Sequence, residues 1–218
     1  MNVESLLDAR SALIVIGGTL IATLLRSGFS DCRVTFGAIA ALFGKRFDAQ
    51  RARSELSVQI REIREDGLLR ADPHPIGDRE FDEVTDALIG HRSLTALHEA
   101  HEAHRRRRMK ENERAVQVLS QATELAPIFG LAGTLLSLAQ LPEGGIAAAA
   151  YAGTISMAVL TTLYGLLLAN LVLAPLARIV ERAAIAEERE REQLVEWLAS
   201  QLASAMPRPH VAPLREAV

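Results

Sequence analysis

The sequence predicts an all-α membrane protein with three transmembrane helices and long helical extensions outside the bilayer. Two charge-free runs carry this prediction: one of about 18 residues follows Glu124 and one of about 34 residues ends before Arg178, and about 20 helical residues cross the hydrocarbon core. Only the polar turn at residues 142–145 separates them, as in a transmembrane hairpin. A buried hairpin of a soluble bundle is the alternative, but two such runs in succession favour the membrane.

The bulk composition excludes several classes of protein. The net charge of -3, with basic and acidic residues mixed, argues against nucleic-acid binding. The single cysteine, Cys32, forbids an internal disulfide. The N-terminus lacks the basic region and cleavage site of a secretory signal, so we expect insertion to rely on the membrane helices themselves.

Residues 1–28 are predicted to contain the first membrane helix. Residues 11–25 form a third apolar run, ended by Arg26. About 15 uncharged residues are short for a span, but the preceding leucines extend the run and Arg10 can snorkel outward. A re-entrant or interfacial helix is the alternative, and a span is favoured.

Residues 29–115 are predicted to form a charged helical domain. The mixture of apolar and charged residues from Phe29 to Phe47 is typical of an amphipathic helix lying along the membrane face. A densely charged helix follows over residues 48–70 and is broken by two prolines and a glycine in residues 71–78. A second charged helix begins after this break and continues through Leu97.

Three histidines spaced i, i+3 and i+6, namely His98, His101 and His104, were weighed as metal ligands. The zinc motif His-Glu-x-x-His places its ligands four residues apart, so the spacing here favours a solvated helix face. The basic cluster Arg105–Arg108 follows, and such clusters near a membrane typically meet anionic headgroups on the cytoplasmic side.

Residues 116–182 hold the predicted hairpin, residues 183–206 a tail helix, and residues 207–218 a Pro-rich tail expected to be disordered. The tail helix is expected to pack on the long middle helix or on a neighbouring copy. Basic residues flank the cytoplasmic ends of membrane helices, and with three spans only Arg10 falls on the opposite side. We therefore expect a periplasmic N-terminus with the charged domain and the tail in the cytoplasm.

The hairpin helices carry small residues and hydroxyls at membrane depth. Small residues let helix backbones approach closely in lipid. Threonine hydroxyls can line a proton or sodium path, although bonding back to their own helix is the commoner role. The small residues are Gly130, Gly133, Thr134 and Ser137 in the first helix and Ser156, Gly165 and Ala169 in the second, and the further hydroxyls are Thr154, Thr161 and Thr162.

Pro127 and Pro175 lie near the predicted cytoplasmic ends, where they either hinge their helices or mark simple helix termini. No Asp, Glu, Lys, Arg or His lies inside the three apolar runs. Because an ion path usually needs an ionisable group, the carboxylate of such a path is expected to come from another chain.

Four motifs resemble the MotA/TolQ/ExbB family of proton-channel and motor subunits. SALIVIGGTLIATLL resembles a helix of MotA-type stators, and IREDGLLRAD resembles the start of their cytoplasmic domain. LAPIFGLAGTLLSL resembles their third helix and MAVLTTLYGLLLANLVLAPLA their fourth. The resemblance implies a ring-shaped pentamer in the bacterial inner membrane, around two single-span partner helices of the MotB, ExbD or TolR kind. It implies that the partner's aspartate carries the ion and that ion passage drives rotation, with no cofactor beyond the translocated H⁺ or Na⁺.

The resemblance also assigns roles to residues. By it, Thr134 and Thr162 match the pore hydroxyls, with Thr161 adjacent, Pro127 and Pro175 match the helix prolines, and Arg64 is the counterpart of charged residues that motility members present to their rotor. MotA-type stators have four spans, whereas three spans are typical of the TolQ/ExbB branch, which carries a glutamate where this sequence has Met157. The load therefore stays open between a flagellum, outer-membrane transport or integrity, and another system, as does the choice of ion.

Two other classes were considered. A non-conducting membrane scaffold, whose charged helices recruit cytoplasmic proteins, is the main rival. An enzyme is the least supported class, since the sequence has no Gly-rich phosphate loop and no nucleophile with a plausible base.

Overall fold

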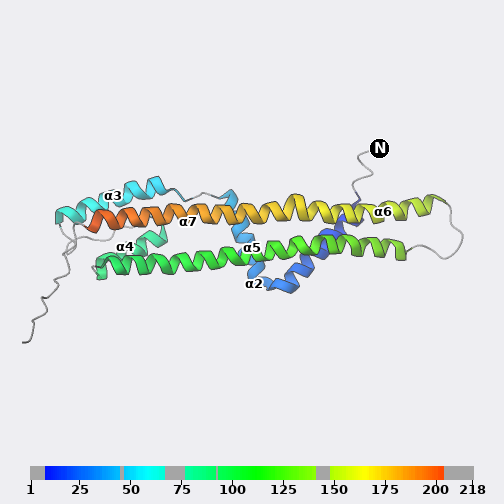
Figure 1. Cartoon of the computed structure of the whole chain (residues 1–218), viewed down its shortest axis with the longest axis horizontal. Coiled ribbons are helices and arrows are strands. Elements are labelled where there is room, and N and C mark those ends of the chain that lie inside the picture. The colour runs from blue at the N-terminus through cyan, green and yellow to red at the C-terminus, as the bar shows by residue number, and fades with distance from the viewer. Residues whose placement is uncertain (1–7, 45–46, 67–76, 92, 141–147, 204–218) are drawn as a thin grey trace, which may run out of the picture. The chain divides into compact units, whose positions relative to one another are not determined.

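The computed structural model describes residues 8–44, 47–66, 77–91, 93–140 and 148–203, and within these ranges every regular element is a helix (Figure 1). The elements are α1 (Ala9–Ala12), the π-helix η2 (Leu13–Gly17), α2 (Gly18–Phe43), α3 (Ala49–Asp66), α4 (Arg79–His91), α5 (Leu94–Ala139), α6 (Ala148–Leu167), the π-helix η3 (Leu168–Leu173) and α7 (Ala174–Ala203). The predicted turn at residues 142–145 and the predicted disordered tail at 207–218 lie outside the described residues.

Three helical stretches are long and apolar enough to cross a membrane: Ala9–Phe43, Leu94–Ala139 and Tyr151–Ala203. Each of them overlaps one of the three predicted apolar runs. The all-helical class and the three long apolar helices are thus confirmed, while the predicted ring remains an expectation.

The chain divides into two compact units, and α5 and α7 supply residues to both. The first unit comprises Met1–Arg46 and Met109–Ile185, and the second comprises Phe47–Arg108 and Ala186–Val218. The first unit holds the membrane hairpin, and the second holds most of the charged helices.

The first helical stretch of the first unit buries small and polar residues and exposes its leucines. Ser11, Val15, Thr19 and Thr23 are buried, and each of the two threonine hydroxyls donates to the carbonyl four residues earlier. Leu25, by contrast, is 81% exposed. This pattern is the reverse of a water-soluble helix and suits a helix whose outer face meets lipid.

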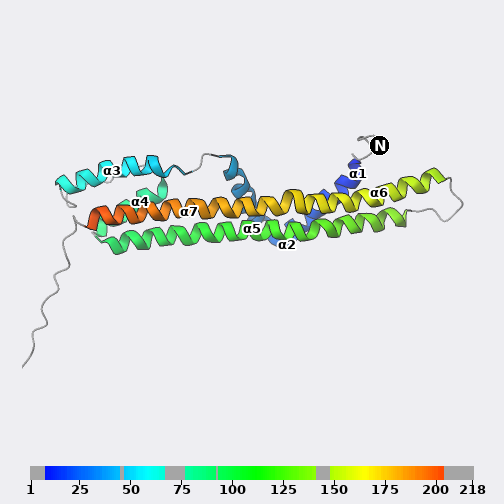
Figure 2. The ribbon, with the colours of Figure 1, turned by 45° about the horizontal axis from the view of Figure 1, so that its top comes forward.

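The helix α2 turns sharply at Gly28, whose φ of 79° and ψ of 161° are not helical. A positive φ is readily adopted only by glycine, so this residue permits the bend. The segment after Gly28 crosses α5 and α7, as both views show (Figures 1 and 2). Its inner face packs Ala38, Ile39 and Leu42 against a small core that includes Leu119. The outer face exposes Phe29, Phe36 and Phe43. The amphipathic helix expected along the membrane face stays a prediction.

The second unit has a conventional apolar core. Residues of α3, α4, the start of α5 and the end of α7 build it, so the tail helix packs within its own chain. The core residues are Ala52, Leu56, Ile60, Phe81, Val84, Leu88, Leu97, Leu194, Val195, Leu198 and Leu202.

The prediction of one charged helix from Asp78 or Arg79 through Leu97 is wrong, because the chain forms two helices there. The carboxylate of Asp78 accepts the backbone N–H of Glu80 and caps α4, which ends at His91. The Ser93 hydroxyl accepts the N–H of Thr95 at 3.2 Å, so a new cap starts α5.

Candidate functional site

The helices α5 and α6 approach each other closely at three glycines. A Cβ added to Gly165 would lie 2.7 Å from the carbonyl oxygen of Ala126 and 3.2 Å from the Cα of Pro127. A Cβ on Gly133 would lie 2.8 Å from the side chain of Thr161, and Gly130 faces the backbone of the same turn. These contacts confirm that small residues set the spacing of the hairpin, as expected for helices packed in lipid.

The close approach brings three predicted hydroxyls together. The Thr134 hydroxyl lies 2.7 Å from that of Thr162 and 3.4 Å from that of Thr161. All three converge on the carbonyl oxygen of Ala158, at 3.0 Å from Thr134, 2.9 Å from Thr161 and 3.3 Å from Thr162. The cluster therefore links α5 to α6 by side-chain hydrogen bonds at membrane depth.

The three threonines differ in exposure. Thr161 is completely buried, whereas Thr134 and Thr162 are half-buried. The side chains of Thr134 and Thr162 are therefore partly open to groups from outside the chain, while Thr161 is enclosed by its own hairpin. A neutral hydroxyl pair can donate and accept hydrogen bonds or contact a cation, but it cannot by itself carry a charge across lipid.

Of the other predicted small residues of the hairpin, two are buried and one is exposed. Ser137 is buried, and its hydroxyl donates to the backbone carbonyl of Thr154 at 2.8 Å. Ala169 is also buried, but Ser156 is exposed and does not join the packed face.

Neither predicted hinge proline is a simple helix terminus. Pro127 lies in the interior of α5, against Gly165. Pro175 is the second residue of α7, just after η3, and the N–H of the intervening Ala174 bonds to the carbonyl of Ala169, five residues earlier. Because proline has no N–H and crowds the preceding turn, a widened turn before it is a physically reasonable accommodation. Whether these sites hinge stays a prediction.

Two polar contacts of the hairpin escaped the sequence reasoning. The Asn170 amide, exposed in the apolar run, donates to the carbonyl of Leu166 at 3.0 Å. The hydroxyl of Tyr164 accepts the backbone N–H of Asp8, which ties the start of the first helix to α6. An asparagine inside an apolar run is a readable signal, whereas a contact across 156 residues has no local signature.

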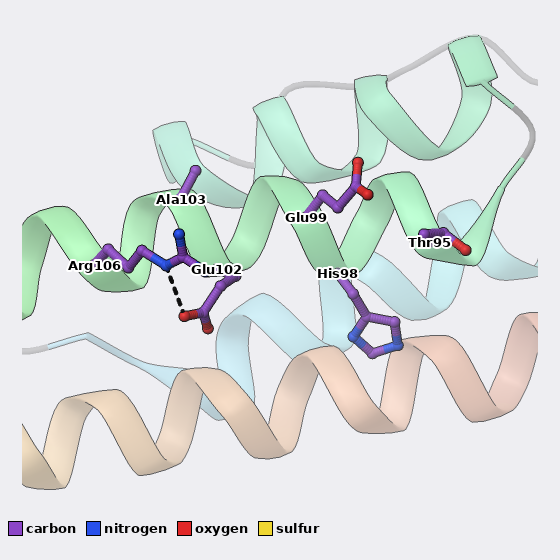
Figure 3. A pocket seen from close by; sticks show the side chains of 6 residues that line it. All are labelled: Thr95, His98, Glu99, Glu102, Ala103 and Arg106. Carbon is purple, nitrogen blue, oxygen red and sulfur yellow. Dashed lines mark hydrogen bonds and ion pairs between the residues drawn. The ribbon is translucent and has the colours of Figure 1, made fainter.

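The predicted rotor-facing residue, Arg64, belongs to α3, but its side chain is outside the described part of the structure. The three histidines do not converge: His101 bonds to Glu80 and His104 to Glu83. His98 lines a shallow pocket of about 460 Å³ along one side of α5, together with Thr95, Glu99, Glu102, Ala103 and Arg106 (Figure 3). No group of three metal ligands occurs in the described residues. The predicted solvated face is wrong for His101, which is buried.

Fold and site together define a multi-pass helical membrane protein in which two closely packed helices, α5 and α6, share a hydroxyl cluster. Comparison with known families identifies the protein family. The chain belongs to the MotA/TolQ/ExbB proton channel family, whose model matches residues 75–193. This is a family of channels, not of enzymes, and it works without a cofactor.

Similar proteins include stator subunits of flagellar motors. The chain is 26% identical to Motility protein A of Cereibacter sphaeroides, over 90% of this chain and 78% of that protein. It is 26% identical to the uncharacterized protein YtxD of Bacillus subtilis, over 94% and 76%. It is 25% identical to the chemotaxis protein PomA of Vibrio alginolyticus, over 81% and 70%.

Solved structures share the fold. The flagellar MotAB stator complex from Bacillus subtilis matches with a TM-score of 0.80 and 18% identity, covering 92% of this chain and 81% of that one. The C. jejuni MotAB structure matches with a TM-score of 0.78 and 17% identity, covering 98% and 89%. These likenesses establish the architecture of the chain.

Proposed function

We propose that this chain is the ring-forming subunit of an ion-driven motor that converts proton, or alternatively sodium, flux into mechanical work. The observation that carries the proposal is the hydroxyl pair of Thr134 and Thr162, half-buried on a hairpin whose described residues hold no Asp, Glu, Lys, Arg or His at that depth. A helix surface with hydroxyls but no charged side chain needs a charged group from a second chain to complete an ion path.

The partner is a single-span protein of the MotB kind with one intramembrane aspartate, and the assembly is a pentamer in the bacterial inner membrane. The similarity to Motility protein A and to PomA favours a flagellar load over outer-membrane transport. The clustering of Lys and Arg favours a periplasmic N-terminus and a cytoplasmic C-terminus.

Within this path, Thr134 and Thr162 are the hydroxyls that contact the ion or the partner's carboxylate. Thr161 supports them by holding the Ala158 carbonyl, to which all three hydroxyls bond. Pro127 and Pro175 are the points at which the helices bend as the ring moves, and Arg64 is the residue presented to the load.

The test is ion flux through the complex purified with its partner and placed in liposomes. Thr162→Val removes the half-buried hydroxyl while keeping the side-chain volume, and we expect flux to fall at least tenfold with assembly intact. Ser137→Ala is the matched control, since it removes a buried hydroxyl of the same hairpin that lies outside the threonine cluster, and flux should not change. Equal flux in the Thr162→Val variant and the unmodified complex would reject the pathway role.

Purification from native membranes tests the partner separately. A copurifying single-span protein with one intramembrane aspartate supports the motor. A chain that purifies without any such protein, and whose vesicles show no leak, supports the non-conducting scaffold instead.

A further inference from the structure

Seven ionisable side chains form a charge cluster that joins α4, α5 and α7 within the second unit. None of them belongs to the proposed ion path. They are Asp78 and Glu80 at the start of α4, His101 and Arg108 on α5, and Glu187, Glu188 and Arg191 on α7.

The two guanidiniums are fully engaged with carboxylates. Arg108 bonds to Glu80, and its Nε and Nη2 donate to the two oxygens of Glu188, each at 3.0 Å. Arg191 donates to Glu80 at 2.7 Å and reaches Asp78 through both terminal nitrogens, at 3.1 and 3.0 Å. Each guanidinium thus donates its hydrogen bonds to carboxylates, and the carboxylate of Glu80 bridges Arg108 and Arg191.

The imidazole of His101 is the incomplete member of the cluster. Its side chain is 8% exposed, and Nδ1 lies 2.8 Å from Oε1 of Glu80. Because an ionised carboxylate only accepts hydrogen bonds, Nδ1 must carry a proton in this contact. The other ring nitrogen, Nε2, is buried without a hydrogen-bond partner, and Oε1 of Glu188 lies 4.0 Å from it. That separation is too long for a hydrogen bond.

The neutral imidazole therefore turns a lone pair toward a carboxylate. A buried polar atom without a partner is costly, and two facing electron-rich groups repel each other. A proton on Nε2 would convert this contact into an N–H directed at Glu188, and the ring would then donate to one acid from α4 and one from α7.

The charge count of the cluster favours the same proton. Four carboxylates, Asp78, Glu80, Glu187 and Glu188, face two guanidiniums, which leaves a balance of two negative charges around a neutral ring. The neighbouring charged groups are already paired: Glu83 bonds to Arg79 and His104, and Arg105 approaches Glu102 and Glu192. The fourth element of the unit, α3, contributes apolar side chains to the core.

We propose that His101 is a proton-binding site that tightens the contact between α4, α5 and α7 when the surrounding water becomes more acidic. The proton binds Nε2, and the separation from Glu188 closes from 4.0 Å to about 2.7–3.2 Å. No other reactant is needed, since the proton comes from water. The site is independent of the proposed ion path, and under the proposed orientation the water that surrounds it is cytoplasmic.

Thermal unfolding of the purified full-length chain tests the proposal. Trp197 is the only tryptophan, and it lies in the second unit, so its fluorescence reports this unit. As the pH falls from 8 to 6, a contact made only by the protonated folded state raises the unfolding midpoint. We expect a rise of about 2–4 °C in the unmodified chain.

Two variants separate His101 from the other histidines. In His101→Gln the rise should disappear, whereas in His104→Gln, which changes a histidine that bonds to exposed Glu83, it should persist. A third variant, Glu188→Gln, removes the carboxylate that a protonated ring would face, so the pH dependence of the midpoint should flatten, while the midpoint itself should fall because Arg108 loses one of its acids. A full rise in His101→Gln overturns the proposal.

Nitrogen NMR of ¹⁵N-histidine in the unmodified chain gives a readout that does not depend on a variant folding. The His101 signal is assigned as the one that is missing from His101→Gln or, if that variant does not fold, as the signal of a buried ring. This signal should show protonation at Nε2 on acidification to pH 6. A ring that stays neutral at pH 6 refutes the site, whereas a failed ion-flux assay leaves it untouched.

Discussion

Removing the charge of Glu80 should destabilise the second unit strongly. This carboxylate is 4% exposed and contacts Arg108, Arg191 and His101. Burial alone raises the pKa of Glu80, but the His101 hydrogen bond and the charges of Arg108 and Arg191 outweigh burial and lower that pKa to about 2. In Glu80→Gln the two guanidiniums lose their shared acid while remaining largely buried.

The size of the effect follows from the pKa. A fall from 4.5 to about 2 corresponds to roughly 3 kcal/mol in favour of the ionised form, and one desolvated partner removed from a buried ion pair typically costs about 3–5 kcal/mol. Arg108 keeps Glu188 and Arg191 keeps Asp78, which reduces the loss. We therefore expect Glu80→Gln to lower the free energy of unfolding by about 2–3 kcal/mol.

The assay is unfolding of the detergent-purified chain followed through Trp197, over whose ring Arg53 lies at 4.7 Å. The matched control is Glu83→Gln, on the same helix but with a side chain 47% exposed, for which we expect a much smaller change because solvent screens an exposed ion pair. If the two glutamine variants unfold at the same midpoint, the charge cluster contributes no more than a surface ion pair and the reasoning is wrong.

Two further predictions follow from the structure. Because the pKa of Glu80 is lowered in the folded state, the stability that its charge contributes is complete above pH 4.5 and is lost as the pH falls toward 2. The midpoint of unfolding, followed through Trp197, should therefore drop across that window, and it should drop less in Glu80→Gln. Gly165→Ala places a Cβ 2.7 Å from a backbone oxygen and should weaken the hairpin, measured as a lower midpoint of the detergent-solubilised protein, whereas Gly153→Ala, with open space around it, should be neutral. Equal unfolding midpoints for the two alanine variants would show that α5 and α6 can move apart at Gly165 without a loss of stability.

The membrane architecture was readable from the sequence because its signal is local. An uncharged run of sufficient length predicts a span without reference to any other part of the chain, and glycines at helical spacing predict close packing. The same locality explains the error at Leu97, where apolar periodicity concealed a change of helix. The Ser93 cap is the signal that could have corrected it.

The charge cluster and the accessibility of the threonines were not readable from the sequence. Arg191 and Glu80 lie 111 residues apart, so their pairing depends on how the helices pack. Thr161 and Thr162 are adjacent in the sequence, yet Thr161 is buried and Thr162 is only half-buried, because consecutive residues of a helix point about 100° apart. Only the position of α5 decides which of the two hydroxyls is covered.

The π-helical segment η3 has a consequence for how α7 is aimed. A π turn holds more residues than an α turn, so the turns that directly follow Leu173 are rotated about the helix axis relative to a regular continuation of α6. Deleting a single residue from this segment would restore a uniform helix and change the face on which Pro175 lies. The face that the first turns of α7 present is thus encoded by the extra residue in η3.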